Sequence, residues 1–501
     1  MLKRNVIANF VSQAWGALMA VAFVPKYVHH LGIDAYGLIG FFAVLQAWLI
    51  LLDLGFAQAL AREMARWTGT RGSPGSARDT LRTVEVLSAS TAGAVTALVW
   101  GYAPAIASCW LRLGDFPASS AIDGIRLMGL VIGVRLLEGT YRGCAMGLQR
   151  QVAVNVISVV VSTLRGAGAW GILVWWDASL GAFFAWQLFA TALGAIATAR
   201  LVYRRIPSDR AGQFSWSEVG RLRGLAGGLA ASAVLMTAIG QVDKAILSRI
   251  LPIDDFGLFM LASSLASGIP MLAAPVTGAV FPRLCELHAR GDDEAFRETF
   301  HRSSQVLVVA TGTATAVLAA CPGLVLTAWS GSIIPRAEVE PLLRLLALGN
   351  FTNTAIWMPY SGYLAHGHVR GLVVLNGLLA SALVPLLIVL TPSCGMFVAP
   401  WIWLASNVIY VAVGTPLVLK QVREVETTAW MVRDTLGPIA AMTIVVIPMA
   451  FISPSVATDR MSAGVFLLCT VVVVAAAGVA SAPKLRAMVL SWAAAMRQRP
   501  S

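Results

Sequence analysis

The sequence is poor in charged residues and in polar stretches. Asp, Glu, Lys and Arg together make up 12% of its 501 residues, about half the share found in typical soluble domains. Its six cysteines show no paired spacing, which argues against a disulfide framework and against a cysteine-based zinc site. No Walker motif is present either. We therefore expect neither a mainly soluble fold nor a pump with its own ATP site.

Long apolar runs take the place of polar sequence. Hydrophobic residues make up 57% of the chain, and its mean hydropathy is +0.75. About fourteen runs, each roughly 18–25 residues long, can cross the hydrocarbon core of a bilayer. They predict an all-α polytopic membrane protein with spans near residues 6–24, 37–60, 84–107, 125–148, 152–175, 180–202, 225–250, 257–281, 306–329, 342–364, 372–390, 396–419, 436–452 and 462–482.

Lysine and arginine are unevenly distributed among the predicted turns. With fourteen spans, the side that holds both termini and the even-numbered turns carries 26 Lys and Arg, and the other side carries five. The positive-inside rule then places both termini in the cytoplasm. The bias holds to the C-terminus, which favours fourteen spans. It also explains the formal charge of +12 as a topology signal, without a nucleic-acid partner. The first span is too long for a typical signal-peptide core and predicts a signal anchor.

The chain repeats itself at an offset of about 220 residues. Residues 33–38 (IDAYGL) correspond to 253–258 (IDDFGL), and 141–143 (YRG) correspond to 360–362 (YSG). Glycine and aromatic residues are common at short turns, but their ordered spacing favours a duplication, as in many transporters. The predicted domains are an N-terminal six-helix bundle (1–202), a cytoplasmic linker that is either polar or amphipathic (203–223), a C-terminal six-helix bundle (224–420), and two additional spans with a cytoplasmic tail (421–501).

The fourth predicted span carries three charges on one helix face. Arg135, Glu138 and Arg142 are spaced i, i+3, i+7. A charge at mid-bilayer costs at least about 2.5–3.5 kcal/mol, so these side chains should face a polar interior. Glu138 can neutralise only one arginine, which leaves a positive charge for an anion. The alternative is a structural ladder that holds this span to a neighbour.

The fifth predicted span carries a polar stripe that ends in an arginine. Asn155, Ser158, Ser162 and Arg165 share one face, and Arg165 is the strongest single candidate for a functional residue. Its alternative role is in packing beside small residues. The excess of guanidinium groups suits a phosphate or pyrophosphate. The predicted substrate-binding residues of a cationic cavity are Arg135, Glu138, Arg142, Arg165, Lys244, Asn155 and Gln13.

Other intramembrane charges have two interpretations each. Asp243 is either a local partner of Lys244 or an ion-coupling residue, and Asp53 either couples an ion or bonds to a neighbouring helix end. Arg126 and Arg344 occupy repeat-related positions at the predicted outer ends of spans 4 and 10. They either line an outer mouth or reach the lipid headgroups.

The start of the chain resembles a known family. The turn at 31–38 (LGIDAYGL), the end of the second span at 51–56 (LLDLGF) with Arg62 after it, and Lys3 and Arg4 before the first span are similar to the polysaccharide transporter family. These are the O-antigen (Wzx-type) flippases of the multidrug/oligosaccharidyl-lipid/polysaccharide exporter superfamily. The resemblance implies two bundles around a cationic cavity and an undecaprenyl-pyrophosphate-linked oligosaccharide as cargo. It also implies alternating access, a proton or sodium gradient in place of a cofactor, and a bacterial inner membrane.

Several readings stay open at this point. The expected partners are the lipid-linked oligosaccharide, membrane lipids and, by resemblance, a polysaccharide polymerase and a chain-length regulator. A lipid II flippase would share the topology and the cationic cavity. A multidrug antiporter should have more acidic cavity residues. A membrane-embedded polymerase or glycosyltransferase should have a longer external loop than any found here, and a channel would not need the two-fold repeat. We expect a transporter rather than an enzyme, with no metal site.

Overall fold

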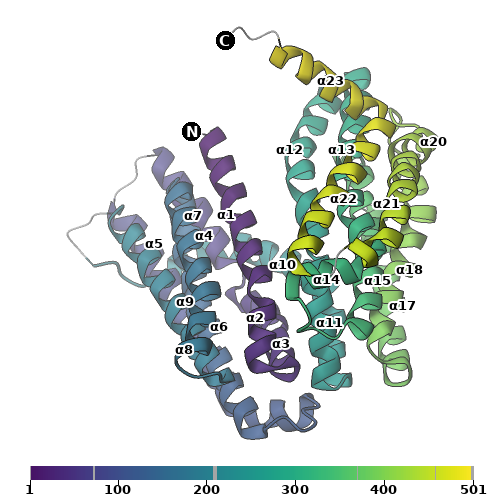
Figure 1. Ribbon diagram of the computed structural model, residues 1–501. Coiled ribbons are helices and arrows are strands. Elements are labelled where there is room, and N and C mark those ends of the chain that lie inside the picture. The colour runs from purple at the N-terminus through teal and green to yellow at the C-terminus, as the bar shows by residue number, and fades with distance from the viewer. Residues whose placement is uncertain (1, 71–73, 207–210, 369, 457–458, 498–501) are drawn as a thin grey trace. The chain divides into compact units, whose positions relative to one another are not determined.

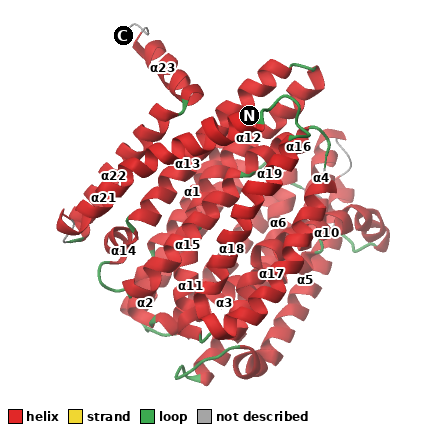
Figure 2. Ribbon diagram, turned by 90° about the vertical axis from the view of Figure 1, so that its right-hand side faces the viewer, coloured by secondary structure: helices red, strands yellow, loops and turns green. Residues whose placement is uncertain are grey.

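The computed structural model describes residues 2–70, 74–206, 211–368, 370–456 and 459–497. Almost all of these residues are helical, and none of them forms a strand beyond an isolated bridge between Arg112 and Pro252 (Figure 2). The chain divides into two compact units, Met1–Gly257 (unit 1) and Leu258–Ser501 (unit 2). The predicted all-α class is thus confirmed. Residues 207–210 of the predicted linker and 498–501 of the predicted tail lie outside the described part of the chain.

Unit 1 is built around α6, which contacts α3, α4, α5, α7 and α9 (Figure 1). Its helical segments are α1 (Leu2–Ala22), α2 (Val24–Leu31), α3 (Ile33–Leu49), η1 (Ile50–Asp53), α4 (Phe56–Thr70), α5 (Pro74–Ala105), η2 (Ile106–Trp110), α6 (Ala118–Gly147), α7 (Gln151–Thr163), η3 (Leu164–Gly168), α8 (Ala169–Trp175), α9 (Leu180–Tyr203) and α10 (Trp216–Ile250).

Unit 2 has α13 at its centre, packed against α12, α15, α21 and α22 (Figure 1). Its helical segments are α11 (Ile253–Ala266, which begins in unit 1), α12 (Gly268–Arg290), α13 (Asp293–Ala320), α14 (Pro322–Ser330), α15 (Arg336–Ala355), α16 (Trp357–Ala365), α17 (Arg370–Cys394), η4 (Gly395–Phe397), α18 (Val398–Ile409), η5 (Tyr410–Gly414), α19 (Thr415–Leu419), α20 (Thr427–Ala429), η6 (Trp430–Leu436), α21 (Gly437–Val456), α22 (Arg460–Ser481) and α23 (Pro483–Arg497).

Small residues explain why α6 can hold so many neighbours. Gly143 and Gly147 are four residues apart, and a Cβ at either position would lie 2.3 or 2.2 Å from a backbone carbonyl oxygen of α4. Gly129 and Gly133, also four apart, face α5, where a Cβ at either position would lie 2.9 Å from the side chain of Val99 or 2.4 Å from that of Thr96. This spacing places small residues on one helix face and lets backbones approach closely, which is a common way to pack helices in lipid. The packing fixes where the charges of α6 lie.

The repeated motif forms a reciprocal contact within unit 1. A Cβ on Gly37 would lie 2.2 Å from the carbonyl oxygen of Ile253, and a Cβ on Gly257 would lie 2.6 Å from the carbonyl oxygen of Ile33. Each glycine of the repeat therefore packs against the isoleucine that begins the other copy of the motif. The short turn before the first copy includes Gly32, whose φ of 85° is accessible to glycine at little cost. These glycines are needed for close approach as well as for turning the chain.

Ten helical stretches of the described residues are long and apolar enough to cross a membrane. One of them, 377–419, has 43 residues and is twice the length that one crossing needs. Three further predicted spans coincide with α6, α10 and the α15–α16 pair, which are not among these ten. The protein is therefore a multi-pass membrane protein, while the number fourteen remains a prediction.

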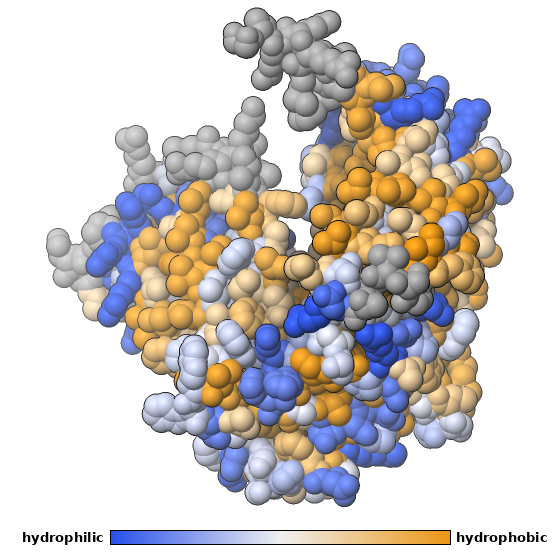
Figure 3. Space-filling view, in the orientation of Figure 1, coloured by the Kyte–Doolittle hydropathy of each residue, from blue (hydrophilic) through white to orange (hydrophobic). Residues whose placement is uncertain are grey.

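The outer faces of the helices are apolar, as lipid contact requires. In unit 2, hydrophobic residues cover much of the flank in Figure 3, with hydrophilic residues above and below them. Large exposed apolar side chains on α21 and α22 contribute to this surface, including Ile444, Phe451, Val465, Leu468 and Val472. An exposed apolar area of this extent is unusual for a soluble monomer and fits a membrane-embedded one.

Candidate functional site

Arg165 lies on η3, a π-helical segment between α7 and α8. A π-helical turn interrupts the regular hydrogen bonding of a helix and is often found at functional sites. Side chains from α2 and α9 bond to the carbonyl oxygens of this segment. Trp186 Nε1 donates to Leu164 (2.7 Å), Gln187 Nε2 donates to Arg165 (3.2 Å) and the Tyr27 hydroxyl donates to Gly166 (2.9 Å). The backbone around Arg165 is therefore held from two sides.

The side chain of Arg165 reaches the acidic residue of α6. Its Nη2 atom lies 3.7 Å from Glu138 Oε2, and the same nitrogen donates a 2.9 Å hydrogen bond to the Thr191 hydroxyl of α9. The two charged side chains are 21% and 19% exposed, so they are largely but not completely shielded. Arg135, half-buried one turn before Glu138 on α6, lies within electrostatic range of both. We call Arg135, Glu138 and Arg165 the arginine cluster.

The arginine cluster carries more positive than negative charge. It holds two guanidinium groups and a single carboxylate. The Nε atoms of Arg135 and Arg165 are both buried and have no hydrogen-bond partner among the described residues. Buried donors normally find partners, and leaving one unpaired costs about 1–3 kcal/mol. An anion with several acceptor oxygens would supply both the missing charge and the missing acceptors.

The pairing within α6 differs from the simplest sequence interpretation. Glu138 was expected to pair with Arg135 or Arg142 of its own helix, but its ion-pair partner is Arg165. Arg142 is exposed and lies one turn nearer the end of α6. The cluster therefore joins α6 to the π-helical segment instead of running along one helix.

The polar stripes of α1 and α7 are used in different ways. Asn155 is buried and donates from its side-chain amide to Asn9 of α1. Thr163 accepts a 2.8 Å hydrogen bond from Trp15 Nε1, which is a second polar link between the same helices. Gln13, by contrast, is exposed. Asn155 thus takes part in helix packing, and its predicted substrate contact and that of Gln13 stay predictions.

The two acidic coupling candidates have local partners. Asp53 accepts a 3.1 Å hydrogen bond from the backbone N–H of Ala57, so it bonds to the start of α4 after the left-handed residues Leu54 and Gly55. Asp243 lies 3.4 Å from Lys244 Nζ. Both arrangements agree with the structural interpretation of these residues, and ion coupling by either stays a prediction.

The repeat-related arginines also differ in their contacts. Arg126 pairs with Asp123 at 3.2 Å, and its guanidinium lies over the ring of Trp100, 5.4 Å from the ring centre. Arg344 is exposed and donates from Nε to the carbonyl oxygen of Ala319 (2.9 Å). Arg126 is therefore held by a tryptophan and an acid at the start of α6, a combination suited to an interfacial position.

An open apolar groove runs beside the same helix. It has a volume of about 550 Å³ and lies between α5 and α6. Small residues of α5 such as Ala92, Gly93 and Ala97 form much of one wall, and Gly133 and Val134 of α6 form part of the other. Val134 precedes Arg135 in the sequence, so α6 carries both the apolar groove and the arginine cluster. The groove is open and lined mainly by apolar atoms, as contact with a hydrocarbon chain would require.

A second buried polar network was not predicted from the sequence. In unit 2, Asp434 of the π-helical segment η6 bonds to His301 and accepts a 2.8 Å hydrogen bond from Gln305 Nε2. Gln305 Oε1 in turn accepts from the backbone N–H groups of Lys484 and Leu485 at the start of α23. We call His301, Gln305 and Asp434 the aspartate network. Asp434 is 133 residues from His301 and 129 residues from Gln305, so no local spacing predicts that these side chains meet.

Comparisons with known proteins agree with this fold. Residues 2–288 match a family model described as "Polysaccharide biosynthesis protein". A solved structure of the lipid II flippase MurJ in an inward closed conformation has a TM-score of 0.71 and 12% identity, covering 95% of this chain and 98% of that one. An inward-facing multidrug resistance MATE family transporter of the MOP superfamily has a TM-score of 0.62 and 13% identity, covering 81% and 94%. A MATE transporter from Vibrio cholerae has a TM-score of 0.55 and 15% identity, covering 85% and 98%. Among curated proteins, a sequence comparison finds no match.

Proposed function

The chain belongs to the polysaccharide biosynthesis protein family, and on that premise we propose that it is a flippase for undecaprenyl-pyrophosphate-linked oligosaccharides. It moves completed repeat units across the bacterial inner membrane by alternating access, for the assembly of a surface polysaccharide or exopolysaccharide. Both termini lie in the cytoplasm, as the charge bias of the turns indicates. A polymerase and a chain-length regulator would use the product on the outer face.

The arginine cluster is the observation that carries this proposal. Its two guanidinium groups exceed its one carboxylate, and both have a buried Nε that finds no partner in the described part of the chain. A pyrophosphate offers acceptor oxygens with the planar spacing that guanidinium groups bind well. An organic cation, the cargo expected of a multidrug antiporter, would be repelled by the same site.

The position of the apolar groove supports an amphiphilic cargo. The groove and the arginine cluster share α6. A lipid with a charged headgroup could therefore contact one helix with both of its parts. A gradient of protons or sodium ions would drive the cycle, with Asp243 and Asp53 as the candidate coupling residues.

A lipid II flippase is the second candidate. It is favoured by the similarity to the MurJ structure, which extends over 95% of this chain. Lipid II is also a polyprenyl pyrophosphate, so the arginine cluster suits both cargoes equally. The two functions differ in the sugar and in what accumulates when the protein is lost.

The deciding experiment uses cells that lack this protein. Lipid-linked oligosaccharides are extracted, and a sugar-modifying enzyme added outside intact spheroplasts tests whether they can be reached. Completed repeat units that accumulate but stay protected support the proposed flip step. Protected lipid II would support the second candidate. Units that reach the outer face but stay unpolymerised would instead assign the protein to a step after flipping, and unchanged lipids would assign it to another solute.

The same cells test the residues. Arg165→Ala and Arg135→Ala, alone and together, should abolish export while the protein remains inserted in the membrane. Arg66→Ala is the matched control, because it removes an exposed arginine that pairs with Glu63 on the same helix at 3.8 Å. Normal export by the double variant would contradict the assignment of the arginine cluster to the cargo.

A further inference from the structure

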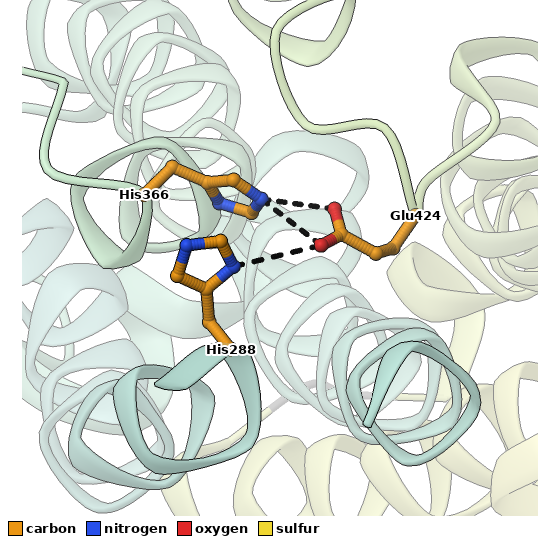
Figure 4. Close-up of side chains that lie close together, drawn as sticks. All are labelled: His288, His366 and Glu424. Carbon is orange, nitrogen blue, oxygen red and sulfur yellow. Dashed lines mark hydrogen bonds and ion pairs between the residues drawn. The ribbon is translucent and has the colours of Figure 1, made fainter. Parts of the chain in front are cut away.

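Three metal-ligating side chains converge in unit 2 from distant parts of the chain. His288 lies in the last turn of α12, His366 directly follows α16, and Glu424 lies in the loop between α19 and α20 (Figure 4). His366 Nε2 is 2.9 Å from Glu424 Oε2, and His288 Nδ1 is 3.6 Å from Glu424 Oε1. The three ligand atoms all lie within 4.8 Å of one another. We call these residues the His–Glu cluster.

The contacts of both ring nitrogens of His366 suit a metal ligand. Its Nδ1 lies 2.9 Å from the carbonyl oxygen of Gly362, and its Nε2 lies against both oxygens of Glu424. A neutral imidazole has one N–H group and cannot donate to acceptors at both nitrogens. With a metal ion at Nε2, the single N–H of a neutral His366 would be free to donate from Nδ1 to Gly362. Metal-bound histidines commonly donate their other N–H to a backbone carbonyl, as His366 is placed to do.

The surroundings hold the cluster in position on one side and leave it open on the other. The side chains of His366 and Glu424 are 9% and 8% exposed, whereas His288 is 39% exposed. The ring of Phe296 meets the ring of His366 edge-on, with centres 5.4 Å apart. Arg297 Nε donates a 3.0 Å hydrogen bond to the backbone carbonyl of Glu424. Two ligands are thus fixed, and the exposed histidine gives a route for an ion.

We propose that the His–Glu cluster binds a divalent transition-metal ion, with Zn²⁺ as the expected species. Two imidazole nitrogens and one carboxylate suit Zn²⁺, whereas Mg²⁺ and Ca²⁺ prefer oxygen ligands throughout. Ligands about 2.0–2.2 Å from a tetrahedral zinc ion lie roughly 3.4 Å apart, and the distances of His366 and His288 from Glu424, 2.9 and 3.6 Å, lie on either side of this value. Water completes the shell. The bound ion joins the ends of α12 and α16 to the loop after α19. This assignment does not depend on the cargo of the transporter.

The test uses the full-length protein in detergent, with any histidine tag removed and resident metal stripped by a chelator. Titration with Zn²⁺ should show one site per chain and raise the temperature of unfolding. Co²⁺ in the same site should give visible absorption bands of a tetrahedral or five-coordinate ion. Failure of the wild-type protein to bind Zn²⁺, with no shift in unfolding temperature, would overturn the proposal.

Variants locate the ion. His288→Ala removes the exposed ligand and Glu424→Gln removes the carboxylate, and each should weaken Zn²⁺ binding by more than the about 10–100-fold that loss of an outer-shell partner causes. His368→Ala is the matched control: this exposed histidine lies near the cluster, its ring centre 6.3 Å from that of His366, without belonging to it. Unchanged binding by His288→Ala would contradict the site, as would equal loss in the control. If Glu424→Gln fails to fold, the His288→Ala variant and the wild-type titration still test whether the His–Glu cluster binds Zn²⁺.

Discussion

Two π-helical segments carry charged side chains into polar clusters, one in each unit. In unit 1, η3 carries Arg165 into the arginine cluster, and in unit 2, η6 carries Asp434 into the aspartate network. Arg165 and Glu138 are 21% and 19% exposed, whereas His301 and Asp434 are 12% and 2% exposed. The same irregular backbone thus serves two environments that differ in accessibility and in charge balance.

The difference separates a binding role from a structural role. Both carboxylate oxygens of Asp434 are bonded, one to His301 and the other to Gln305. Gln305 also accepts a hydrogen bond from the start of α23. In the arginine cluster, two guanidinium Nε atoms have no partner among the described residues. Buried charges that are fully paired define a packed structure, while unpaired donors near a surface leave capacity for a ligand. A π-helical segment alone does not distinguish the two cases.

Breaking the aspartate network should have the largest effect on stability. Asp434→Ala leaves His301 and Gln305 without their buried partner, and we expect the free energy of unfolding to fall by about 3–5 kcal/mol. Thermal unfolding of the purified protein in detergent measures the change. Asp434→Asn, which keeps an acceptor for Gln305, should lose less. An Asp434→Ala protein as stable as the wild type would contradict the structural role of the aspartate network.

Glu138→Gln should separate stability from export. The ion pair with Arg165 is shielded but not fully buried, so we expect a loss of about 1–3 kcal/mol, between the values for exposed and buried pairs. Export should fall further than this loss explains, because the balance of two guanidinium groups against one carboxylate is changed. The spheroplast assay, normalised to the amount of inserted protein, measures it. Export that falls only in proportion to protein amount would make Glu138 purely structural.

The repeated glycines test whether the two copies of the motif are equivalent. Gly37→Ala and Gly257→Ala each place a Cβ within 2.6 Å of a backbone carbonyl oxygen, so we expect each to cost about 1–3 kcal/mol through overpacking. Gly16→Ala is the control, because nothing lies within 4 Å of its Cβ and alanine favours a helix. The unfolding temperatures of the three variants are compared. A lower unfolding temperature for only one of the two motif variants would contradict reciprocal packing.

A helix cap that belongs to neither cluster should give the smallest effect. The hydroxyl and backbone N–H of Ser462 bond to Asp459 at the start of α22 and hold the pKa of this carboxyl below its ordinary value. A lowered pKa means that the carboxylate stabilises the fold above its unfolded-state pKa and that this contribution is lost as the pH falls through the folded-state value. Asp459→Ala should therefore lower the unfolding temperature slightly at neutral pH and not in acid. If the variant still unfolds at a lower temperature than the wild type in acid, the charge of Asp459 is not the cause.

Helical periodicity made part of unit 1 predictable. Arg135 and Glu138 are three residues apart, and residues at this spacing share a face in any helix. The strongest candidate, Arg165, was identified by the same reasoning from its polar stripe, and the structure brings it to Glu138 at 3.7 Å. The sequence did not show that Glu138 pairs with Arg165 rather than with a neighbour on its own helix, because that choice depends on how α6 and η3 are rotated towards each other.

The His–Glu cluster could not be predicted from the sequence. His288, His366 and Glu424 are separated by 58 residues or more, and none of them lies in a recognisable ligand motif. Their short-range surroundings are ordinary helix ends. They meet because the packing of α12, α13 and α16 brings those ends together. The expectation of no metal site came from cysteine spacing alone, which carries no information about such a cluster.

The sequence by itself determined the membrane-embedded helical class, the charge asymmetry of the turns, the internal repeat and the excess of basic residues within the spans. Each of these depends on composition or on spacing along one helix, and both are local properties of the chain. Tertiary structure alone decided which charges are paired, which guanidinium donors lack partners, and which distant side chains form the His–Glu cluster. The physical reason is that contacts between helices depend on their crossing, rotation and close approach, which small residues such as those of α6 permit but do not specify.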